Sequence, residues 1–301
     1  MDGILNVNKP LGWTSFDVVG FVRRHSGVKR VGHAGTLDPA AEGVLLVCLG
    51  QATRVVEYLM DAPKSYLARI RLGATTDTYD ADGSIVRTGD PSGVTPEQLE
   101  TTLLSFKGAI QQKPPIYSAI KREGVPLYKY ARAGKEVELE ARSVEVYDIA
   151  LVDFATPTAT VRVDCSRGTY IRSIAHDLGE LLGCGAHLEG LVRLAIGPFR
   201  VEAAVDIERL REALESDSWR DLVLPIDSVL LDWRAAILGE ENADNARTGR
   251  TLDLQPLDEE RVRSLPEGAQ CRAYSLDGRL IALLRYEGEG RIWRPEKVFL
   301  S

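Results

Sequence analysis

The sequence concentrates residues that could do chemistry in a glycine-rich segment at positions 32–43, which reads Gly-His-Ala-Gly-Thr-Leu-Asp-Pro-Ala-Ala-Glu-Gly. Glycine permits unusual φ angles and close approach of the backbone to a ligand. Pro39 disfavours helical backbone at the preceding residue, so Asp38 is expected in an extended conformation. A carboxylate presented in this way can serve as a nucleophile. The segment alone is equally typical of a turn in which Asp38 only caps the next element, and that simpler interpretation is preferred on these residues alone.

The elements that must position this segment are predicted to be short strands and helices. A strand over 3–7 ends at Lys9-Pro10, and a helix follows from Thr14 or Ser15 to Gly27. The apolar run 44–49 predicts a buried strand, and residues 66–72 alternate as a half-buried strand does. Further strands are expected at 143–153, 158–165, 270–275 and 279–286, and further helices at 51–60, 95–106, 174–182 and 206–215.

A long segment at 111–142 has a different character. It is punctuated by proline, rich in Lys, Arg and Tyr, and carries a local net charge of +3. It lacks sustained periodicity except for a short helix expected near 127–133. Long excursions from compact domains are usually functional or disordered, and this composition favours contact with an anionic partner.

Length and charge limit the overall organisation. A chain of 301 residues predicts two domains, which we place at 1–228 and 229–301, the second small and β-rich. The net charge of −7 divides into −1 for residues 1–204 and −6 for the rest. A nucleic-acid partner is therefore not excluded, because the field at a surface depends on local arrangement.

The sequence offers little for metals, disulfides or membranes. Its four cysteines lie far apart without a Cys-x-x-Cys pair, which predicts free thiols in a reducing cytoplasm. Asp80-x-Asp82-Gly83 resembles the start of a calcium loop, but the twelfth position is Gly89 rather than Glu, so a hairpin turn is expected instead. No apolar run is long enough to span a membrane, and no secretory signal is visible at the N-terminus.

Ordered motifs along residues 3–200 resemble the bacterial tRNA pseudouridine-55 synthase family. The glycine-rich segment with Leu37-Asp38-Pro39 resembles the family signature. The other matching segments are Asn8-Lys9-Pro10 with Thr14-Ser15, Lys64-Ser65-Tyr66, Arg71-Leu72-Gly73, Thr76-Asp77-Thr78 with Asp80-Ala81-Asp82-Gly83, Pro114-Pro115-Ile116-Tyr117-Ser118-Ala119, Leu127-Tyr128 with Tyr130-Ala131-Arg132, Gly168-Thr169-Tyr170-Ile171-Arg172 and Leu182-Gly183-Cys184-Gly185-Ala186-His187.

The resemblance implies an enzyme that isomerises one uridine in the T loop of tRNA. It assigns the nucleophile to Asp38, and the sequence leaves open whether the carboxylate attacks the base or the ribose. Arg172 would keep Asp38 ionised through a bidentate ion pair. Tyr66 would stack on the uracil and help to remove the C5 proton, although an isolated strand tyrosine is more often a core residue. Tyr170 would pack beside it.

The remaining implied positions concern RNA binding. His33 matches a residue that contacts RNA near the flipped nucleotide, and Lys9 would support the loop or contact a phosphate. Leu191 would add apolar surface near the base, although Val192 and Leu194 depart from a Leu-Arg-Arg-Thr-like family segment. In the 111–142 insertion, which would close on the T loop, Lys121 and Arg132 are the expected RNA contacts.

The fold implied by the resemblance is an α/β (α+β) domain. It has a mixed, largely antiparallel central sheet, flanking helices and an RNA-binding insertion, and it is followed by a small C-terminal β-barrel of the PUA type. No cofactor or metal is implied, and we expect a cytoplasmic monomer with tRNA as its partner.

Three alternatives stay open at this stage. The first is an RNA chaperone or tRNA-binding protein without catalysis. The second is a glycoside or nucleoside hydrolase, which would need a second carboxylate, and Glu42 is the only other acid in the motif. The third keeps the chemistry but uses another RNA as substrate.

Overall fold

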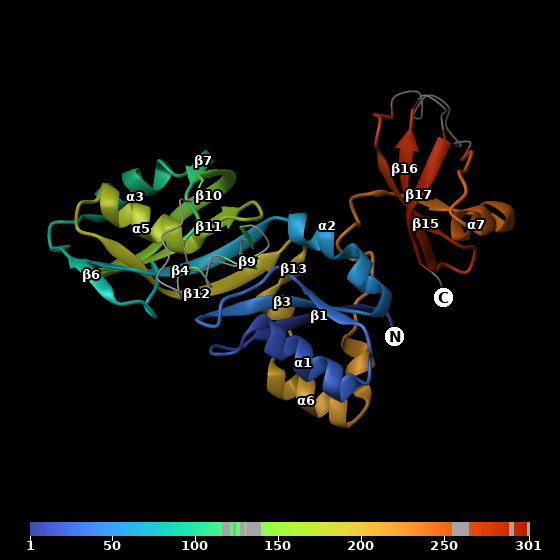
Figure 1. Cartoon of the computed structure of the whole chain (residues 1–301), viewed down its shortest axis with the longest axis horizontal. Coiled ribbons are helices and arrows are strands. Elements are labelled where there is room, and N and C mark those ends of the chain that lie inside the picture. The colour runs from blue at the N-terminus through green and yellow to red at the C-terminus, as the bar shows by residue number, and fades with distance from the viewer. Residues whose placement is uncertain are drawn as a thin grey trace.

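The computed structural model describes residues 1–115, 121–122, 125–126, 130, 140–254, 265–288 and 292–299. Figure 1 shows a long twisted sheet flanked by helices, with a smaller β-rich unit at one end of it. No helix among the described residues is long and apolar enough to cross a membrane.

A nine-stranded sheet forms the large unit. Its main path runs β1-β3-β12-β4-β11-β10-β7, with β2 paired to β3 and β13 paired to β12. Only the β3–β12 pair is parallel, so the expected mixed and largely antiparallel sheet is confirmed. The strands are β1 (Gly3–Lys9), β2 (Val31–Ala34), β3 (Ala41–Leu49), β4 (Lys64–Leu72), β7 (Gly108–Gln112), β10 (Arg142–Ala155), β11 (Thr158–Cys165), β12 (Ala186–Ile196) and β13 (Phe199–Arg200).

Two short hairpins stand outside this sheet. β5 (Ala74–Thr76) pairs with β6 (Ile85–Thr88), which confirms the hairpin expected around Asp80-x-Asp82-Gly83. β8 (Lys121–Arg122) pairs with β9 (Val125–Pro126) inside the predicted insertion. The helix expected near 127–133 falls largely outside the described residues.

The helices begin and end at the signals in the sequence. Thr14 forms a capping box with Asp17 and Gly27 ends α1 with φ of 69°, while Thr95 and Gln98 form a second capping box at α3. The α-helices are α1 (Ser15–Ser26), α2 (Val56–Asp61), α3 (Pro96–Leu104), α5 (Ile171–Leu181), α6 (Ile207–Glu215) and α7 (Glu240–Arg247), with 3₁₀ turns at Gly50–Val55, Val201–Ala203 and Ser218–Leu222. The helix expected over 51–60 is thus part 3₁₀ and part α.

Different helices cover different parts of the sheet. Helices α3 and α5 bury Leu99, Leu103, Ile174 and Leu178 against the apolar face of β4, β10 and β11. Helices α1 and α6 pack on β1 and β3 in a separate cluster. The first of these cores contains both Ile171 at the start of α5 and Leu37 in the segment that follows β2, so it supports both sides of the site.

The C-terminal unit has its own four-stranded sheet in the order β14-β15-β16-β17. Its strands are β14 (Arg234–Ile237), β15 (Gln270–Tyr274), β16 (Leu280–Glu287) and β17 (Ile292–Val298). Asp277-Gly278 forms the predicted turn between β15 and β16, with φ of 80° at Gly278. The sheet character matches the expectation, and closure into a barrel stays a prediction.

The C-terminal unit packs directly on the large unit. Leu283 and Phe299 share a buried cluster with Ile4 and Val44. Lys297 pairs with Glu57 of α2, and Arg272 donates to the carboxylate of Asp227 at 3.0 Å. The two units are therefore joined by a continuous apolar core and by ion pairs.

Strand β12 was not predicted, and it is the central element of the sheet. It lies between β3 and β4, and its backbone approaches β3 very closely at Gly43, where φ is 106°. A Cβ at Gly43 would lie 2.3 Å from the carbonyl oxygen of Arg193. Only glycine satisfies both the left-handed backbone and this contact.

We expect Gly43→Ala to destabilise the protein by at least about 2 kcal/mol, because the methyl group adds a clash to an unfavourable φ. Gly20→Ala is the matched control, since Gly20 lies inside α1 with no atom near its missing Cβ. That change should be neutral or stabilise by about 0.5–1 kcal/mol. Urea unfolding of both variants measures the difference, and equal stabilities would contradict the proposed backbone constraint.

Candidate active site

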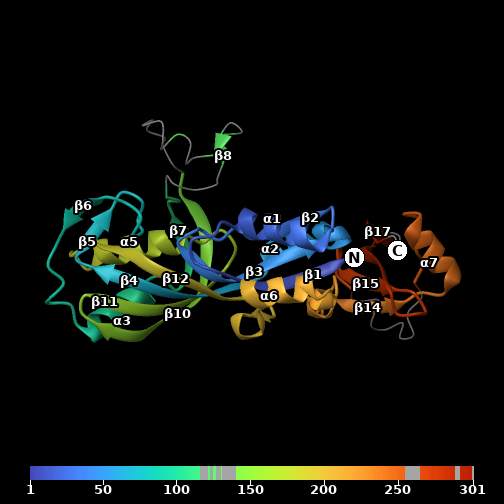
Figure 2. The same ribbon diagram turned by 90° about the horizontal axis from the view of Figure 1, so that it is seen from below.

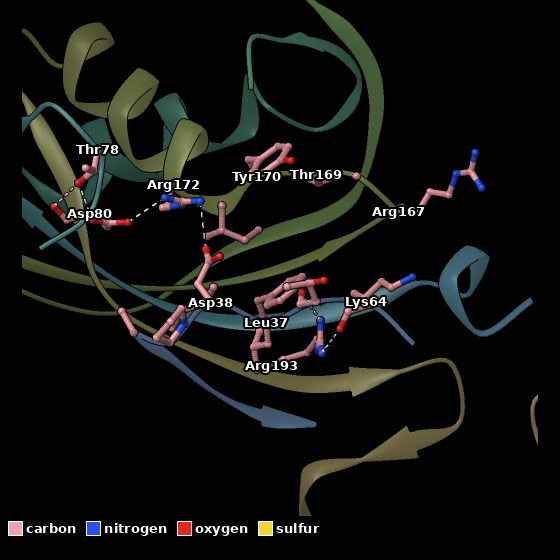
Figure 3. Close-up of a pocket in the computed structure, with 18 of the residues that line it drawn as sticks. Leu37, Asp38, Lys64, Thr78, Asp80, Arg167, Thr169, Tyr170, Arg172 and Arg193 are labelled. Carbon is pink, nitrogen blue, oxygen red and sulfur yellow. Dashed lines mark hydrogen bonds and ion pairs between the residues drawn. The ribbon is translucent and has the colours of Figure 1, made fainter. Parts of the chain in front are cut away.

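A cavity of about 810 Å³ opens where the glycine-rich segment meets the start of α5. Its lining includes the segment 35–40 after β2, Met60 of α2, strand β4, the turn between β5 and β6, and residues 166–172. Strand β12 contributes Leu191 and Arg193. Figure 3 shows these side chains around the cavity.

Asp38 and Arg172 meet at this cavity. The Arg172 Nη2 lies 3.1 Å from Asp38 Oδ2, and its side chain is 9% exposed while that of Asp38 is 49% exposed. The guanidinium therefore faces the carboxylate from a buried position, and the carboxylate keeps an open side toward the cavity. The ion pair therefore orients the Asp38 carboxylate and leaves it accessible to a ligand in the cavity.

The expected bidentate pair between Arg172 and Asp38 is wrong in its geometry. The other guanidinium nitrogen, Nη1, bonds Asp80 Oδ2 at 2.9 Å, so the fork of Arg172 is divided between two carboxylates. Figure 3 shows Arg172 between them. A buried cation near the first turn of a helix is disfavoured by desolvation and by the helix dipole, and two carboxylates offset that cost.

Asp80 is a site residue that the sequence reasoning missed. Its carboxylate also accepts from Thr78 Oγ1 at 2.6 Å and from the Asp82 backbone N–H at 3.2 Å. These contacts fix the orientation of the Asp80 carboxylate, and the Asp80 side chain is only 12% exposed. Asp80 therefore orients Arg172, whereas Asp38 is the carboxylate available for chemistry. The signal in the sequence was the segment Asp80-Ala81-Asp82-Gly83, which matched the family but was interpreted as a hairpin turn without a role in the site.

The segment carrying Asp38 is fixed from two sides. Ser15 Oγ accepts from the Leu37 N–H at 2.9 Å and contacts the Leu37 carbonyl at 3.1 Å. On the other side, Arg193 donates to the carbonyls of Gly35 at 3.0 Å and Val44 at 2.7 Å. Arg193 is 1% exposed. The Arg193 guanidinium therefore supplies hydrogen-bond donors to backbone carbonyls that would otherwise be buried without partners.

Arg193 also was not predicted as a functional residue. The sequence reasoning noted that Val192 and Leu194 depart from the family segment and left its polar contacts in doubt. The structure shows that Arg193 provides polar contacts there, and that they go to the backbone of the segment holding Asp38. Leu191 lines the cavity from the same strand, as expected.

Tyr66 lies in the cavity wall and is 9% exposed. Burial raises the pKa of its phenol, and the nearby Arg193 guanidinium acts in the opposite direction. The phenol is therefore neutral near pH 7. The ring at the wall of the cavity can pack against a planar base, and the role of Tyr66 at the C5 proton stays a prediction.

Tyr170 is placed by the base of the insertion. Gln112 at the end of β7 accepts from the Tyr170 N–H at 2.7 Å and donates to the Tyr170 carbonyl at 3.0 Å. Ser173 Oγ donates to the Lys113 carbonyl at 2.9 Å. Tyr170 lines the cavity, and these three bonds link its position to the chain that enters the insertion.

Two roles were predicted for Lys9, support of the loop or contact with an RNA phosphate, and the structure favours the first. Lys9 is fully buried, and its ammonium donates to the carbonyls of Pro10 at 2.9 Å and Trp13 at 2.7 Å. Burial lowers its pKa to about 8. The ammonium stabilises the turn before α1 and does not reach solvent, where a phosphate would bind.

The other predicted contacts are distributed differently. His33 lies on β2 with its ring in edge contact with Phe16 at 5.2 Å, and burial lowers its pKa. Glu42, the second carboxylate considered for the hydrolase hypothesis, is not among the residues that line the cavity. The side chain of Lys121 and all of Arg132 lie outside the described residues. No group of three potential metal ligands occurs among the residues described.

Comparison with known proteins identifies the family of this chain. Two family models match adjacent stretches, "TruB family pseudouridylate synthase (N terminal domain)" over residues 23–171 and "tRNA pseudouridylate synthase B C-terminal domain" over 172–231. A tRNA pseudouridine synthase B of Dehalococcoides mccartyi is 43% identical over 300 residues, covering 100% of this chain and 97% of its own. The chain belongs to the TruB family of pseudouridylate synthases.

Other relatives support the family and the fold. The tRNA pseudouridine synthase B of Geobacter sulfurreducens is 41% identical over 283 residues, 94% of this chain and 93% of that protein. A chain in the crystal structure of a Cbf5–Nop10–Gar1 complex superposes with a TM-score of 0.74 at 26% identity, covering 99% of this chain and 85% of that one. The boundary between the two family models, at 171/172, falls inside the large sheet unit rather than between structural units.

We expect Asp80→Asn to lower the rate of pseudouridine formation at saturating RNA by about 10- to 100-fold, because Arg172 loses the anion that orients it. The KM for RNA should change little. Asp82→Asn in the same turn is the charge-matched control, since its carboxylate forms no ion pair with any described residue. Equal rates for the two variants would contradict the orienting role of Asp80.

The buried ammonium of Lys9 predicts a pH effect on stability. Its pKa is about 8 in the folded protein and about 10.4 in an unfolded chain. Between these values the unfolded chain binds the additional proton, so folding becomes more favourable as pH rises. The free energy of unfolding of wild type minus that of Lys9→Met should therefore increase from pH 8 to pH 10. Parallel pH profiles of the two proteins in urea unfolding would contradict this.

Proposed function

We propose that this protein converts the uridine at position 55 in the T loop of tRNA to pseudouridine, with Asp38 as the nucleophile. The observation that carries the proposal is the open carboxylate of Asp38 held by a buried Arg172 at the cavity, in a chain of the TruB family. The names of the relatives support tRNA as the substrate.

The chemistry requires one bond to be exchanged for another. The N1–C1′ glycosidic bond breaks, the uracil turns within the cavity, and a C5–C1′ bond forms. The hydrogen on C5 leaves as a proton and N1 gains a proton, so substrate and product are isomers. Asp38 would form a transient covalent bond to either the base or C1′, which divides a difficult step into easier ones. The carboxylate is released when the product forms, so the reaction is redox-neutral and returns the enzyme unchanged.

The walls of the cavity suit this sequence of steps. A uridine inside a folded loop must leave its stack to reach Asp38, at a cost of a few kcal/mol. Tyr66 and Leu191 offer apolar surface that would offset part of this cost, and Tyr170 adds a ring at the side of α5. Arg172 would hold the Asp38 carboxylate in position for attack, because the two groups form an ion pair at the cavity.

The test uses tRNA carrying tritium at uracil C5, since isomerisation leaves the mass unchanged but releases that hydrogen. Wild type should release one equivalent per tRNA, and a transcript with cytidine at position 55 should release none. Asp38→Asn should bind tRNA with near wild-type affinity and reduce release by at least about 10⁴-fold, since no nucleophile remains.

Each outcome separates the alternatives left open by the sequence. Tight binding without release by wild type would favour a tRNA-binding protein without catalysis. Release that persists with cytidine at position 55 would move the target to another uridine. Release by Asp38→Asn at the wild-type rate would remove Asp38 from the role of nucleophile.

A further inference from the structure

Helix α1 exposes a side that begins directly beside the catalytic segment. Ser15, which binds the backbone of Leu37, is buried, and the next residue, Phe16, is 73% exposed. The Phe16 ring contacts the ring of His33 edge-on, with an interplanar angle of 84°. The aromatic ring of Phe16 is thus exposed to solvent, and its neighbour Ser15 contacts the segment that carries Asp38.

Four cations continue this side of the helix away from the cavity. Arg23 follows Phe16 by seven residues, which is about two turns and about 10 Å along the axis on nearly the same face. Arg24 lies beside it, and Lys29 and Arg30 follow in the loop to β2. All four are exposed, and none forms an ion pair with any residue that the structure describes. Many other exposed cations of the chain do, as Lys107 does with Asp148 and Arg162 with Asp164.

The surroundings leave this side open. Helix α6 packs on another side of α1, where the Arg211 guanidinium lies 5.7 Å from the ring of Phe21. Asp17 of α1 and Asp2, which lines a hollow together with Lys29 and Arg30, form no ion pair with a described cation. Asp17 accepts from the Thr14 N–H at 2.8 Å, and Asp2 accepts from the Gln51 N–H at 2.7 Å. In Figure 2, α1 lies along the edge of the molecule from which β8 projects.

We propose that Phe16, Arg23, Arg24, Lys29 and Arg30 form a docking surface for the paired stem that adjoins the target loop of the RNA. This surface is the α1 stripe, and the inference rests on the proposed function. The phosphates of a stem leading away from a nucleotide in the cavity would follow the four cations. Phe16, at the cavity end, would stack on an unpaired base near the junction of loop and stem.

The physical case depends on charge and on shape. The chain as a whole has a net charge of −7, which does not favour RNA binding. The exposed cations of the α1 stripe, which form no ion pair with a described residue, attract RNA phosphates locally. Paired RNA is recognised mainly through its backbone and shape rather than through base edges. A row of arginines and a lysine beside an aromatic residue fits a stem end better than it fits an apolar protein partner.

The test measures RNA binding as a function of salt for the full chain. Arg23→Gln/Arg24→Gln should bind an isolated T-arm hairpin about tenfold more weakly than wild type. The magnitude of the slope of log Kd against log salt should fall by roughly one to two, because each lost phosphate contact removes about 0.9. Phe16→Ala should weaken binding by roughly fivefold or more without changing the slope. The rate of tritium release at saturating RNA should stay at the wild-type level in both variants.

The matched control is Lys107→Gln/Arg162→Gln, which changes the net charge equally at cations already paired with carboxylates. It should keep the wild-type slope. A single-stranded oligonucleotide with the loop sequence should bind wild type and Arg23→Gln/Arg24→Gln equally, since it lacks the stem.

Two results would overturn the α1 stripe: an unchanged slope and affinity in Arg23→Gln/Arg24→Gln, or an equal slope change in the control. These results are independent of catalysis. If wild type released no tritium, the proposed function would fail, and the slopes would still decide whether the stem binds on α1.

Discussion

The site depends on one buried guanidinium that is divided between two carboxylates. Arg172 lies in the first turn of α5, where neither burial nor the helix dipole favours a cation. The carboxylate of Asp80, which is fixed in a hairpin turn, forms an ion pair with this cation. The carboxylate of Asp38, in the cavity wall, forms a second one. Because the first carboxylate is fixed and the second is half-exposed, the same cation both holds the structure together and keeps a reactive anion at the surface.

A second group of buried cations holds the backbone around this ion-pair system. Arg193, Lys9 and Lys64 each donate to main-chain carbonyls rather than to carboxylates. Loops that leave a sheet have carbonyls without strand partners, and an unpaired buried carbonyl is costly. A long cationic side chain can satisfy two or three such groups at once. The cost is a lowered pKa, to about 8 for Lys9 and for Lys64.

Local signals in the sequence predicted local structure well. The capping boxes of α1 and α3, the alternation of β4 and the turn at Asp277-Gly278 each depend on neighbouring residues, and all were confirmed. Strand β12 was missed because its glycine and charged residues interrupt any alternation, and only the partners β3 and β4 make it a strand. Asp80 and Arg193 were missed for the same reason: their roles arise from contacts across about 90 and 150 residues. The resemblance identified Asp38 and Arg172, but not the second carboxylate between which the guanidinium is shared.

The central position of β12 also sets an order of events during synthesis. Strands β3 and β4 leave the ribosome more than a hundred residues before β12, yet β12 is the strand that joins them. Until it arrives, the two strands present unpaired edges, which are templates for association with other chains. The segment holding Asp38 likewise lacks the carbonyl contacts of Arg193 until then. A nascent chain therefore joins the two halves of its sheet and gains the Arg193 contacts of the catalytic segment together, late in translation. A chain truncated before residue 186 would keep only the Ser15 contacts of that segment.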